Sequence, residues 1–523
     1  MYDYRQGIQT ASLFRQQKQQ QQQQQRPHPR LAVAKLHLQQ PVLRPESNKK
    51  EATGRVTGAA LLFAGTAVGA GMLALPAETA AAGYLPTVGS LLACWAFTYT
   101  TSLVTLEAAW RVSVGTSRDT QNTENDDDSN TAAAAASAGF LSISQTTLGP
   151  VGTVATVVLF WFLLTSIIVA YTAQGGALLV QAVQELGPAA ARSVQIPVAA
   201  GSTLFLTVFA ALAVSGTQRV DWVNRLLVAG LIASFGILVA VGVPQISVAE
   251  LLQRADWRAV DSKVLSVGIL SFGAQNVVPT LLQYLGRDPV RTRRAILLGS
   301  LIPLVMYCMW EAVFLGLVPY DAVDAGALGN GGSSNDDKMQ IVTALGGSGG
   351  AMVKDLVAVF SACAIGSSMA GASVSLVDFF QDGIVSSSSA VLWPSNKTES
   401  SPLGGRVVVA VLALGPPLAL ACAFPGVFLS ALEYAGLLGG VSLYGLLPAL
   451  AVIKLRARDE SSGDAGDVDG APIDDGVMPG QLVGGSAALY AIIGVSLALV
   501  LPELVQLGEI AIGAATAAAI ANY

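Results

Sequence analysis

Long apolar stretches separated by short polar connectors fill the chain from residue 56 to about residue 503. Each stretch is near the roughly 20 residues that a helix needs to cross a bilayer. The pattern predicts eleven transmembrane helices and an all-α integral membrane protein. The predicted spans are Val56–Ala82, Tyr84–Trp110, Val151–Val180, Val194–Val214, Val223–Val243, Val264–Tyr284, Ala295–Val318, Met352–Phe380, Gly405–Phe424, Phe428–Ile453 and Gln481–Leu501.

Both ends of the chain fall outside this pattern. Residues 1–55 form a polar, glutamine-rich tail with ten Lys or Arg residues against Asp3, Glu46 and Glu51. The tail has no apolar core of a secretory signal, and it fits an organellar transit peptide or a disordered tail equally well. We therefore expect either a plastid inner membrane or a plasma membrane location. Residues 504–523, which include the alanine-rich Leu507–Ile520, predict a short C-terminal segment that lies at the interface or frays.

Composition supports the membrane assignment. The 523 residues are 52% hydrophobic and only 12% charged, whereas soluble domains carry about 25% charged residues. We therefore expect most of the chain to be embedded in the lipid bilayer. A net charge of −6, with no basic patch laced with aromatic residues, argues against a nucleic-acid partner.

The distribution of Lys and Arg predicts the orientation. With eleven spans and a cytosolic N-terminus, thirteen Lys or Arg residues fall in the inner connectors and six in the outer ones. The positive-inside rule then puts the N-terminus inside, or in the stroma or matrix of an organelle, and the C-terminus outside.

The first predicted span contains a segment that disfavours a continuous helix. Gly65, Gly69, Gly71 and Pro76 fall within thirteen residues, Ala64–Pro76. Glycine weakens a helix and proline removes a backbone donor. Irregular backbone in a membrane is tolerated where it lines a cavity, as in the broken helices that hold a transporter's substrate. The alternative is a helix-packing seam of small residues.

The sixth span contains a second such segment. Gly273, Gln275, Asn276 and Pro279 lie in the middle of its apolar run. Polar amides there are costly unless they face a partner or a cavity. The sixth span lies five spans after the first and runs in the opposite direction. Two inverted five-helix repeats, with a binding site between their broken helices, give this arrangement.

The first break also resembles a known signature. Residues 65–76, Gly-Thr-Ala-Val-Gly-Ala-Gly-Met-Leu-Ala-Leu-Pro, are similar to the motif of the tryptophan/tyrosine permease family, the hydroxy- and aromatic amino acid permeases. Departures from the family are the long tail, the acidic loop at 119–128 and the pair Gln275-Asn276. Weaker matches are Ala170–Gly176, Tyr284–Gly286, Leu298–Glu311, Ser368 with Val377–Phe379, Ala435–Gly440 and Leu447–Pro448.

The resemblance implies a LeuT-type fold, a 5+5 inverted repeat with spans one and six broken, and uptake of aromatic amino acids. The chemistry of the breaks agrees with this. The half-helix that starts near Gly71 offers N–H groups to a substrate carboxylate. Unwound carbonyls of Ala67, Val68, Ser271 and Phe272 can accept from its ammonium group. The candidate substrate-binding residues are Gly65, Thr66, Ala67, Val68, Gly69, Gly71, Met72, Tyr171, Ser271, Phe272, Gly273, Gln275, Asn276 and Ser368.

Several of these side chains have a structural alternative. Phe272 and Tyr171 can belong to the packed core instead of a pocket. Ser361, Ser368 and Ser375 recur every seven residues and so share one face of the eighth span. That face can line a cavity or seal a helix seam.

Acidic residues inside spans are the candidates for proton coupling. Glu311 lies deep in the seventh span and Glu78 follows Pro76. Intramembrane acids are functional candidates by default, although many are paired structural acids. The resemblance favours proton symport over sodium. Sodium stays open, because the carbonyls near Ala67 and Val68 and the hydroxyls of Ser367 and Ser368 could coordinate it.

Other functions lack the residues they need. His28 and His37 both lie in the tail, so the membrane part can hold no Ser–His dyad. No aspartate pair sits mid-span, no nucleotide-binding glycine loop is present, and the four cysteines lie singly. We therefore expect no enzyme, metal site or cofactor. A sensor that binds amino acids on the same fold without transporting them is the remaining alternative.

Overall fold

The computed structural model describes residues 54–122, 139–186, 196–317, 350–386, 402–461 and 485–521. The predicted tail up to residue 53 therefore lies outside the described residues, as does most of the acidic loop at 119–128. The described residues are helical and contain no strand. The longer helices are α2 (Val56–Ala67), α3 (Gly71–Thr79), α4 (Tyr84–Asn122), α6 (Phe140–Thr147), α7 (Gly149–Leu186), α9 (Val198–Val214), α10 (Thr217–Gly242), α12 (Ser262–Ser271), α13 (Val278–Tyr284), α14 (Pro289–Leu317), α17 (Gly350–Ser386), α18 (Pro402–Ala423), α19 (Phe428–Tyr434), α20 (Leu447–Ser461) and α21 (Gly485–Ala521).

Short elements complete the described chain. The connection between α10 and α12 holds η1 (Val243–Gln245), α11 (Val248–Leu251) and η2 (Trp257–Ala259). The turn η3 (Gln275–Val277) separates α12 from α13, and the π-helical stretch η4 (Ala435–Leu446) joins α19 to α20.

Nine helical stretches in the described residues are long and apolar enough to cross a membrane, or up to ten if α2 and α3 form one bent span. The fourth predicted span, Val194–Val214, corresponds to α9, an apolar helix of 17 residues. An integral multi-pass membrane protein is therefore supported, while the count of eleven spans stays a prediction. Residues 507–520, expected to form a separate segment, continue α21 without a break.

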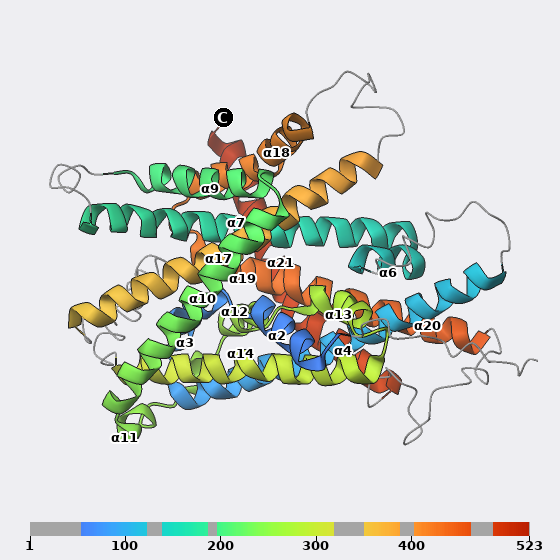
Figure 1. Ribbon diagram of the computed structural model, residues 1–523, viewed down its shortest axis with the longest axis horizontal. Helices are drawn as coiled ribbons and strands as arrows, with labels where there is room; N and C mark the ends of the chain where they lie inside the picture. Colours follow the sequence, from blue (N-terminus) through green and yellow to red (C-terminus); the bar gives the residue numbers. More distant parts are fainter. Residues whose placement is uncertain are drawn as a thin grey trace, which may run out of the picture. The chain divides into compact units, whose positions relative to one another are not determined.

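The interrupted helices lie among the continuous ones. Figure 1 shows α7, α9 and α18 along one side of the bundle and α4 and α14 along the other, with α2, α12 and α13 between them. α14 packs against both α2 and α4, and α12 contacts α3, α4 and η4. Every residue of α3 is buried. The bundle thus encloses the two segments whose sequence disfavours a continuous helix.

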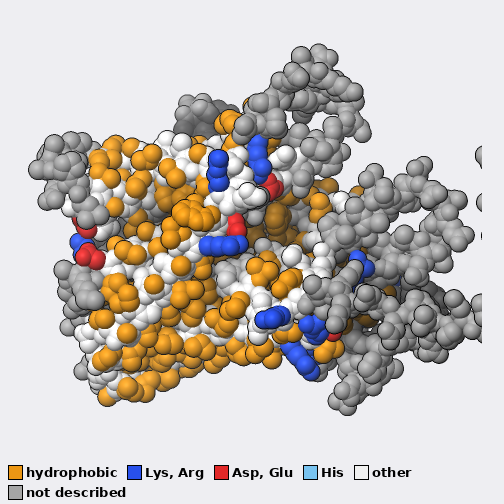
Figure 2. All heavy atoms as spheres, viewed as in Figure 1, with side chains coloured by type: hydrophobic (Ala, Val, Ile, Leu, Met, Phe, Trp, Pro, Cys, Tyr) orange, Lys and Arg blue, Asp and Glu red, His pale blue; other side chains and the backbone are white. Residues whose placement is uncertain are grey.

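The outer surface is apolar. Figure 2 shows a face covered mostly by hydrophobic side chains, with the few charged ones in small groups. Val151, Trp222 and Val411 are among the large hydrophobic residues that are more than 60% exposed. Exposed apolar area on this scale is unusual for a soluble monomer and is what lipid tails would cover.

One charged cluster is buried inside the bundle. Glu107 of α4 is fully buried and receives two hydrogen bonds from Arg456 of α20, at 2.8 and 2.7 Å. Arg111, one turn further along α4, adds a third at 3.1 Å. Two-point contact between a guanidinium and a carboxylate is among the stronger polar interactions in proteins. The cluster ties α4 to the end of α20.

Candidate functional site

The chain bends by 55° between α2 and α3. α2 ends at Ala67, and the backbone of the next residue, Val68, is extended (φ −73°, ψ 110°). Close neighbours explain the glycines that follow. A Cβ atom at Gly71 would lie 3.0 Å from the Cα of Ser271, and one at Gly69 would collide with the hydroxyl of Ser368. Glycine is therefore required here by the approach of α12 and α17 to the break.

Ser368 of α17 partners the unwound backbone directly. Its Oγ accepts a hydrogen bond of 2.9 Å from the N–H of Ala70. A membrane-embedded N–H without a partner is costly, so this hydroxyl stabilises the break. The N–H groups of Met72 and Leu73 donate to the carbonyls of Gly69 and Ala70.

A second interruption lies between α12 and η3. Helical structure ends at Ser271 and resumes at Gln275. Tyr307 of α14 joins the two interruptions. Its hydroxyl lies 2.8 Å from the carbonyl oxygen of Ala67 and 2.8 Å from that of Ser271, and it can donate to one of them at a time. The irregular backbone of α2–α3 and of α12–η3 therefore meets at one place.

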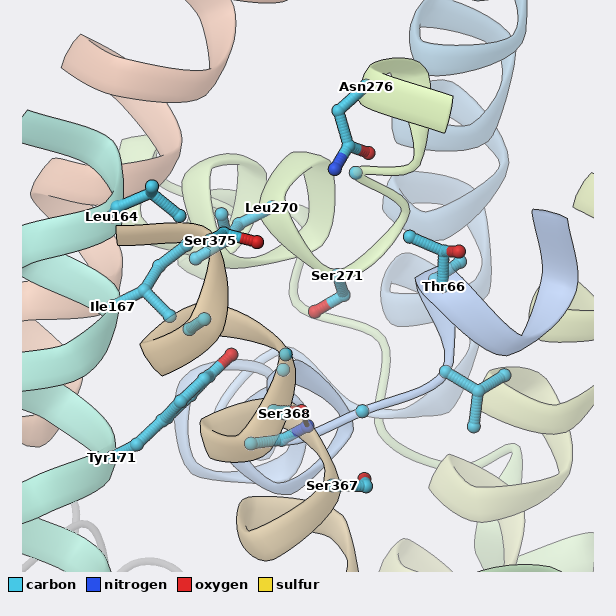
Figure 3. Close-up of a pocket in the computed structure, with 18 of the residues that line it drawn as sticks. Thr66, Leu164, Ile167, Tyr171, Leu270, Ser271, Asn276, Ser367, Ser368 and Ser375 are labelled. Atoms are coloured by element: carbon cyan, nitrogen blue, oxygen red, sulfur yellow. Dashed lines mark hydrogen bonds between the residues drawn. The ribbon is translucent and has the colours of Figure 1, made fainter. Parts of the chain in front are cut away.

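A cavity of about 340 Å³ opens at this meeting point. Figure 3 shows Leu164 and Ile167 of α7 on one side of it and Thr66 and Asn276 on the other, with Ser271 between them. Hydroxyl, amide and backbone groups thus face one part of the cavity, and aliphatic side chains face another. This is suited to a small molecule with a polar end and an apolar body.

Most of the sequence-predicted residues line the cavity: Gly65, Thr66, Ala67, Val68, Gly69, Gly71, Tyr171, Ser271, Gly273, Asn276 and Ser368. The other three lie elsewhere. Met72 is fully buried in the core and Phe272 packs against Tyr307, with ring centroids 5.0 Å apart. Gln275 is buried and its amide lies 3.2 Å from the hydroxyl of Thr101 on α4.

The cavity also includes residues that the sequence reasoning did not select: Phe160, Leu163, Leu164, Ile167, Asn224, Val228, Leu270, Gly371, Ala372 and Tyr444. Ser367 and Ser375 also line it, and the seven-residue serine spacing had already marked the face that holds Ser375. Asn224 could have been predicted from the sequence, because it is a polar amide in the fifth predicted span. The aliphatic residues of α7 could not have been predicted, because nothing distinguishes them from other apolar residues in the span.

Glu311 lies outside the cavity, fully buried in α14. Its Oε2 accepts a hydrogen bond of 3.0 Å from the hydroxyl of Thr79 at the end of α3. Its Oε1 has no hydrogen-bond partner among the described residues. A buried carboxylate with an unpaired oxygen is costly, so this position favours a group that can hold a proton.

Glu78 has a different environment. It is 9% exposed and interacts electrostatically with Lys263 and Glu433. Lys263 in turn lies 3.7 Å from Glu433. In the part of the chain that the structure describes, no group of three His, Cys, Asp or Glu residues could hold a metal ion.

Interrupted helices that border a cavity within an apolar helical bundle define a membrane transport protein rather than an enzyme. Comparison with known sequences identifies the family of transport proteins. The chain belongs to the tryptophan/tyrosine permease family, whose sequence profile matches residues 52–464. The resemblance seen in residues 65–76 is thereby confirmed.

Characterised relatives cover most of the chain. A tyrosine-specific transport system 1 of Haemophilus influenzae is 28% identical over 387 residues, 73% of this chain and 84% of the relative. A tryptophan-specific transport protein of Pseudomonas aeruginosa is 27% identical, over 77% of this chain and 86% of the relative. A glutamine transporter 2 of Aliivibrio fischeri is 27% identical over half of this chain and 61% of its own length.

Proposed function

We propose that this protein is a secondary active transporter that moves aromatic amino acids, tyrosine and tryptophan above all, together with protons. The observation that carries the proposal is the cavity between the two helix interruptions. Its volume of about 340 Å³ lies within the range of about 300–1,000 Å³ that is usual for small-molecule sites. The names of the tyrosine- and tryptophan-specific relatives support the choice of substrate.

The polar part of the cavity fits the head of an amino acid. A carboxylate is stabilised at a helix N-terminus, where the N–H of Gly71, the first residue of α3, can donate to it. An ammonium group needs acceptors, which the carbonyls of Ala67 and Val68 and the hydroxyl of Ser271 supply. The aliphatic residues of α7 then face the substrate side chain.

The fold that we propose is LeuT-type, with two inverted repeats of five helices and eleven spans in all. Two interruptions support it, one in α2–α3 and one in α12–η3. With α9 counted as the fourth span, they fall five spans apart, as inverted repeats require.

For the coupling ion we propose a proton, with Glu311 as the residue that carries it. Its burial favours this role, as does the fact that Thr79 is its only hydrogen-bond partner among the residues that the structure describes. Sodium coupling is the alternative, and Ser367 with the carbonyl of Ala67 would then coordinate the ion. A sensor that binds but does not transport would show substrate affinity without flux. Either a plastid inner membrane or a plasma membrane would supply the proton gradient.

Uptake into proteoliposomes tests the proposal. The purified protein should accumulate radiolabelled tyrosine or tryptophan when an inward proton gradient is imposed without sodium. A protonophore should abolish the accumulation. Phenylalanine, alanine and glutamine serve as comparison substrates. Accumulation that needs sodium and ignores the pH gradient would overturn proton coupling, and binding without flux would favour a sensor.

A further inference from the structure

We propose that Gly371 of α17 sets the size of the substrate side chain that the cavity accepts, and that the hydroxyl of Ser375 binds a polar group at the end of that side chain. The inference rests on the proposed function, because it assigns the side-chain part of the same amino acid site.

Gly371 faces open space. A Cβ atom built on it would have no atom within 4 Å, although the residue lines the cavity. Its neighbours Met369 and Ala370 are buried, so α17 is packed on its other face. Gly69, which also lines the cavity, has no such room, because a Cβ atom there would collide with Ser368. The missing side chain of Gly371 therefore creates volume in the cavity.

The wall of the cavity beside α17 is aliphatic. Figure 3 shows Leu164 and Ile167 of α7 on the same side of the cavity as Ser375. α7 and α17 pack against each other nearby, where the rings of Phe160 and Phe379 lie 5.3 Å apart. The bare backbone at Gly371 and the aliphatic side chains of α7 therefore form a slot, the part of the cavity that can hold an apolar or aromatic side chain.

The polar residues Thr66 and Asn276 lie on the far side of the cavity from this slot. An amino acid whose head group lies at the helix interruptions would therefore direct its side chain toward α7 and α17. The reverse orientation would place a charged head group against Leu164 and Ile167, which is unfavourable.

Ser375 lies one helical turn beyond Gly371 on the same face of α17. It is exposed to the cavity, and Figure 3 shows its hydroxyl directed toward the interior. A hydroxyl can donate and accept, so it can pair with a phenol or with an indole N–H. Phenylalanine offers no such group, and its binding should not depend on Ser375.

Binding measurements on the purified full-length protein test both roles. Affinities for tryptophan, tyrosine, phenylalanine and alanine are compared in the parent, Gly371→Ala, Gly371→Val and Ser375→Ala. A few extra carbons in a pocket change selectivity by about tenfold or more. We expect Gly371→Val to weaken tryptophan binding by at least that factor while alanine binding changes little, and Gly371→Ala to give a smaller shift in the same direction. Ser375→Ala should weaken tyrosine but not phenylalanine.

Gly494→Val is the matched control, since Gly494 of α21 also has open space around it and does not line the cavity. If Gly371→Val fails to insert or fold, Gly371→Ala still decides the question, because alanine is favoured over glycine in a helix. A parent that binds no amino acid would refute the proposed function. A parent that binds aromatic amino acids, with the same preferences in both Gly371 variants, would refute this inference alone.

Discussion

The hydroxyl of Tyr307 on α14 lies 2.8 Å from the carbonyl oxygen of Ser271, the last residue of α12. The same hydroxyl lies equally close to the carbonyl of Ala67, the last residue of α2. A single fully buried side chain thus partners the C-terminal ends of both interrupted helices. The relative position of the two breaks, and with it the width of the cavity, depends on this residue.

Tyr307→Phe should therefore destabilise the protein by about 1–3 kcal/mol, because it removes the buried donor that the carbonyls of Ala67 and Ser271 share. It should also weaken substrate binding, since the two breaks are no longer joined. Thermal unfolding in detergent measures the first effect and a binding assay the second. Tyr490→Phe, at a position of α21 that is 62% exposed, is the control. Equal stability of the two variants would contradict the role given to Tyr307.

Gly71→Ala should disturb the site through its backbone. The added Cβ atom would press on Ser271, so α3 and α12 must separate, and overpacking of this kind costs about 1–3 kcal/mol. We expect loss of binding together with normal membrane insertion. Gly236→Ala in α10, where nothing lies within 4 Å of the new methyl group, should behave like the parent. Parental binding in Gly71→Ala would show that this contact does not shape the site.

Two arginine ion pairs, one buried and one exposed, allow a matched comparison of stability. Arg456→Met removes two hydrogen bonds from the buried carboxylate of Glu107 and keeps the one from Arg111, and breaking a buried pair costs about 3–5 kcal/mol. Arg225→Met breaks an exposed pair with Asp221, which is worth about 0–1 kcal/mol. Denaturant or thermal unfolding should show a clearly larger loss of stability in Arg456→Met than in Arg225→Met. Similar losses of stability in the two variants would mean that the buried ion pair contributes little to the stability of the protein.

The sequence alone predicted the two interruptions and about half of the residues that line the cavity, because glycine, proline and mid-span amides are local signals. Side-chain direction was not accessible in the same way. Met72 and Phe272 adjoin the breaks but are buried in the core. Met72 follows the bend of 55° between α2 and α3, and Phe272 packs against Tyr307. Gln275 lies in the second break, yet its amide turns toward α4.

Residues from distant helices were harder still to predict. Tyr307 lies in an ordinary apolar helix, and nothing near it in the sequence indicates two carbonyl partners from other helices. In the sequence, Gly371 is one of many small residues in the eighth predicted span. Only the structure shows that the space next to its Cα atom is open. The burial of Glu311 was predictable, because an acid within a long apolar run is visible without any structure, while its role in proton coupling stays a prediction.

The number of spans can be settled by labelling. If α9 crosses the membrane as the fourth of eleven spans, its two flanking connectors lie on opposite sides. The chain is first freed of Cys94, Cys308, Cys363 and Cys422, none of which forms a disulfide. Single cysteines placed at Asp127 and at Tyr523, both outside the described residues, should then react with an impermeant reagent from opposite faces. Reaction of both from one face would mean an even number of spans and would remove the inverted repeat.

Glu311→Gln tests the proposed proton coupling most directly. Glutamine keeps the size of the side chain and can still pair with Thr79, but it cannot release a proton. We expect the variant to lose most of its accumulation of substrate down a proton gradient, because no group would then load and unload the coupling proton. Exchange of labelled for unlabelled substrate at equal pH needs no net proton movement and should continue near the parental rate.

Glu509→Gln is the matched control for this experiment, because Glu509 lies on the exposed surface of α21. It should leave both accumulation and exchange unchanged. The pH dependence adds a second readout. Uptake by the parent should rise as the outside is made more acidic than the inside, and uptake by Glu311→Gln should follow the substrate gradient alone. A Glu311→Gln variant that still accumulates substrate and still responds to the pH gradient would show that another group carries the proton.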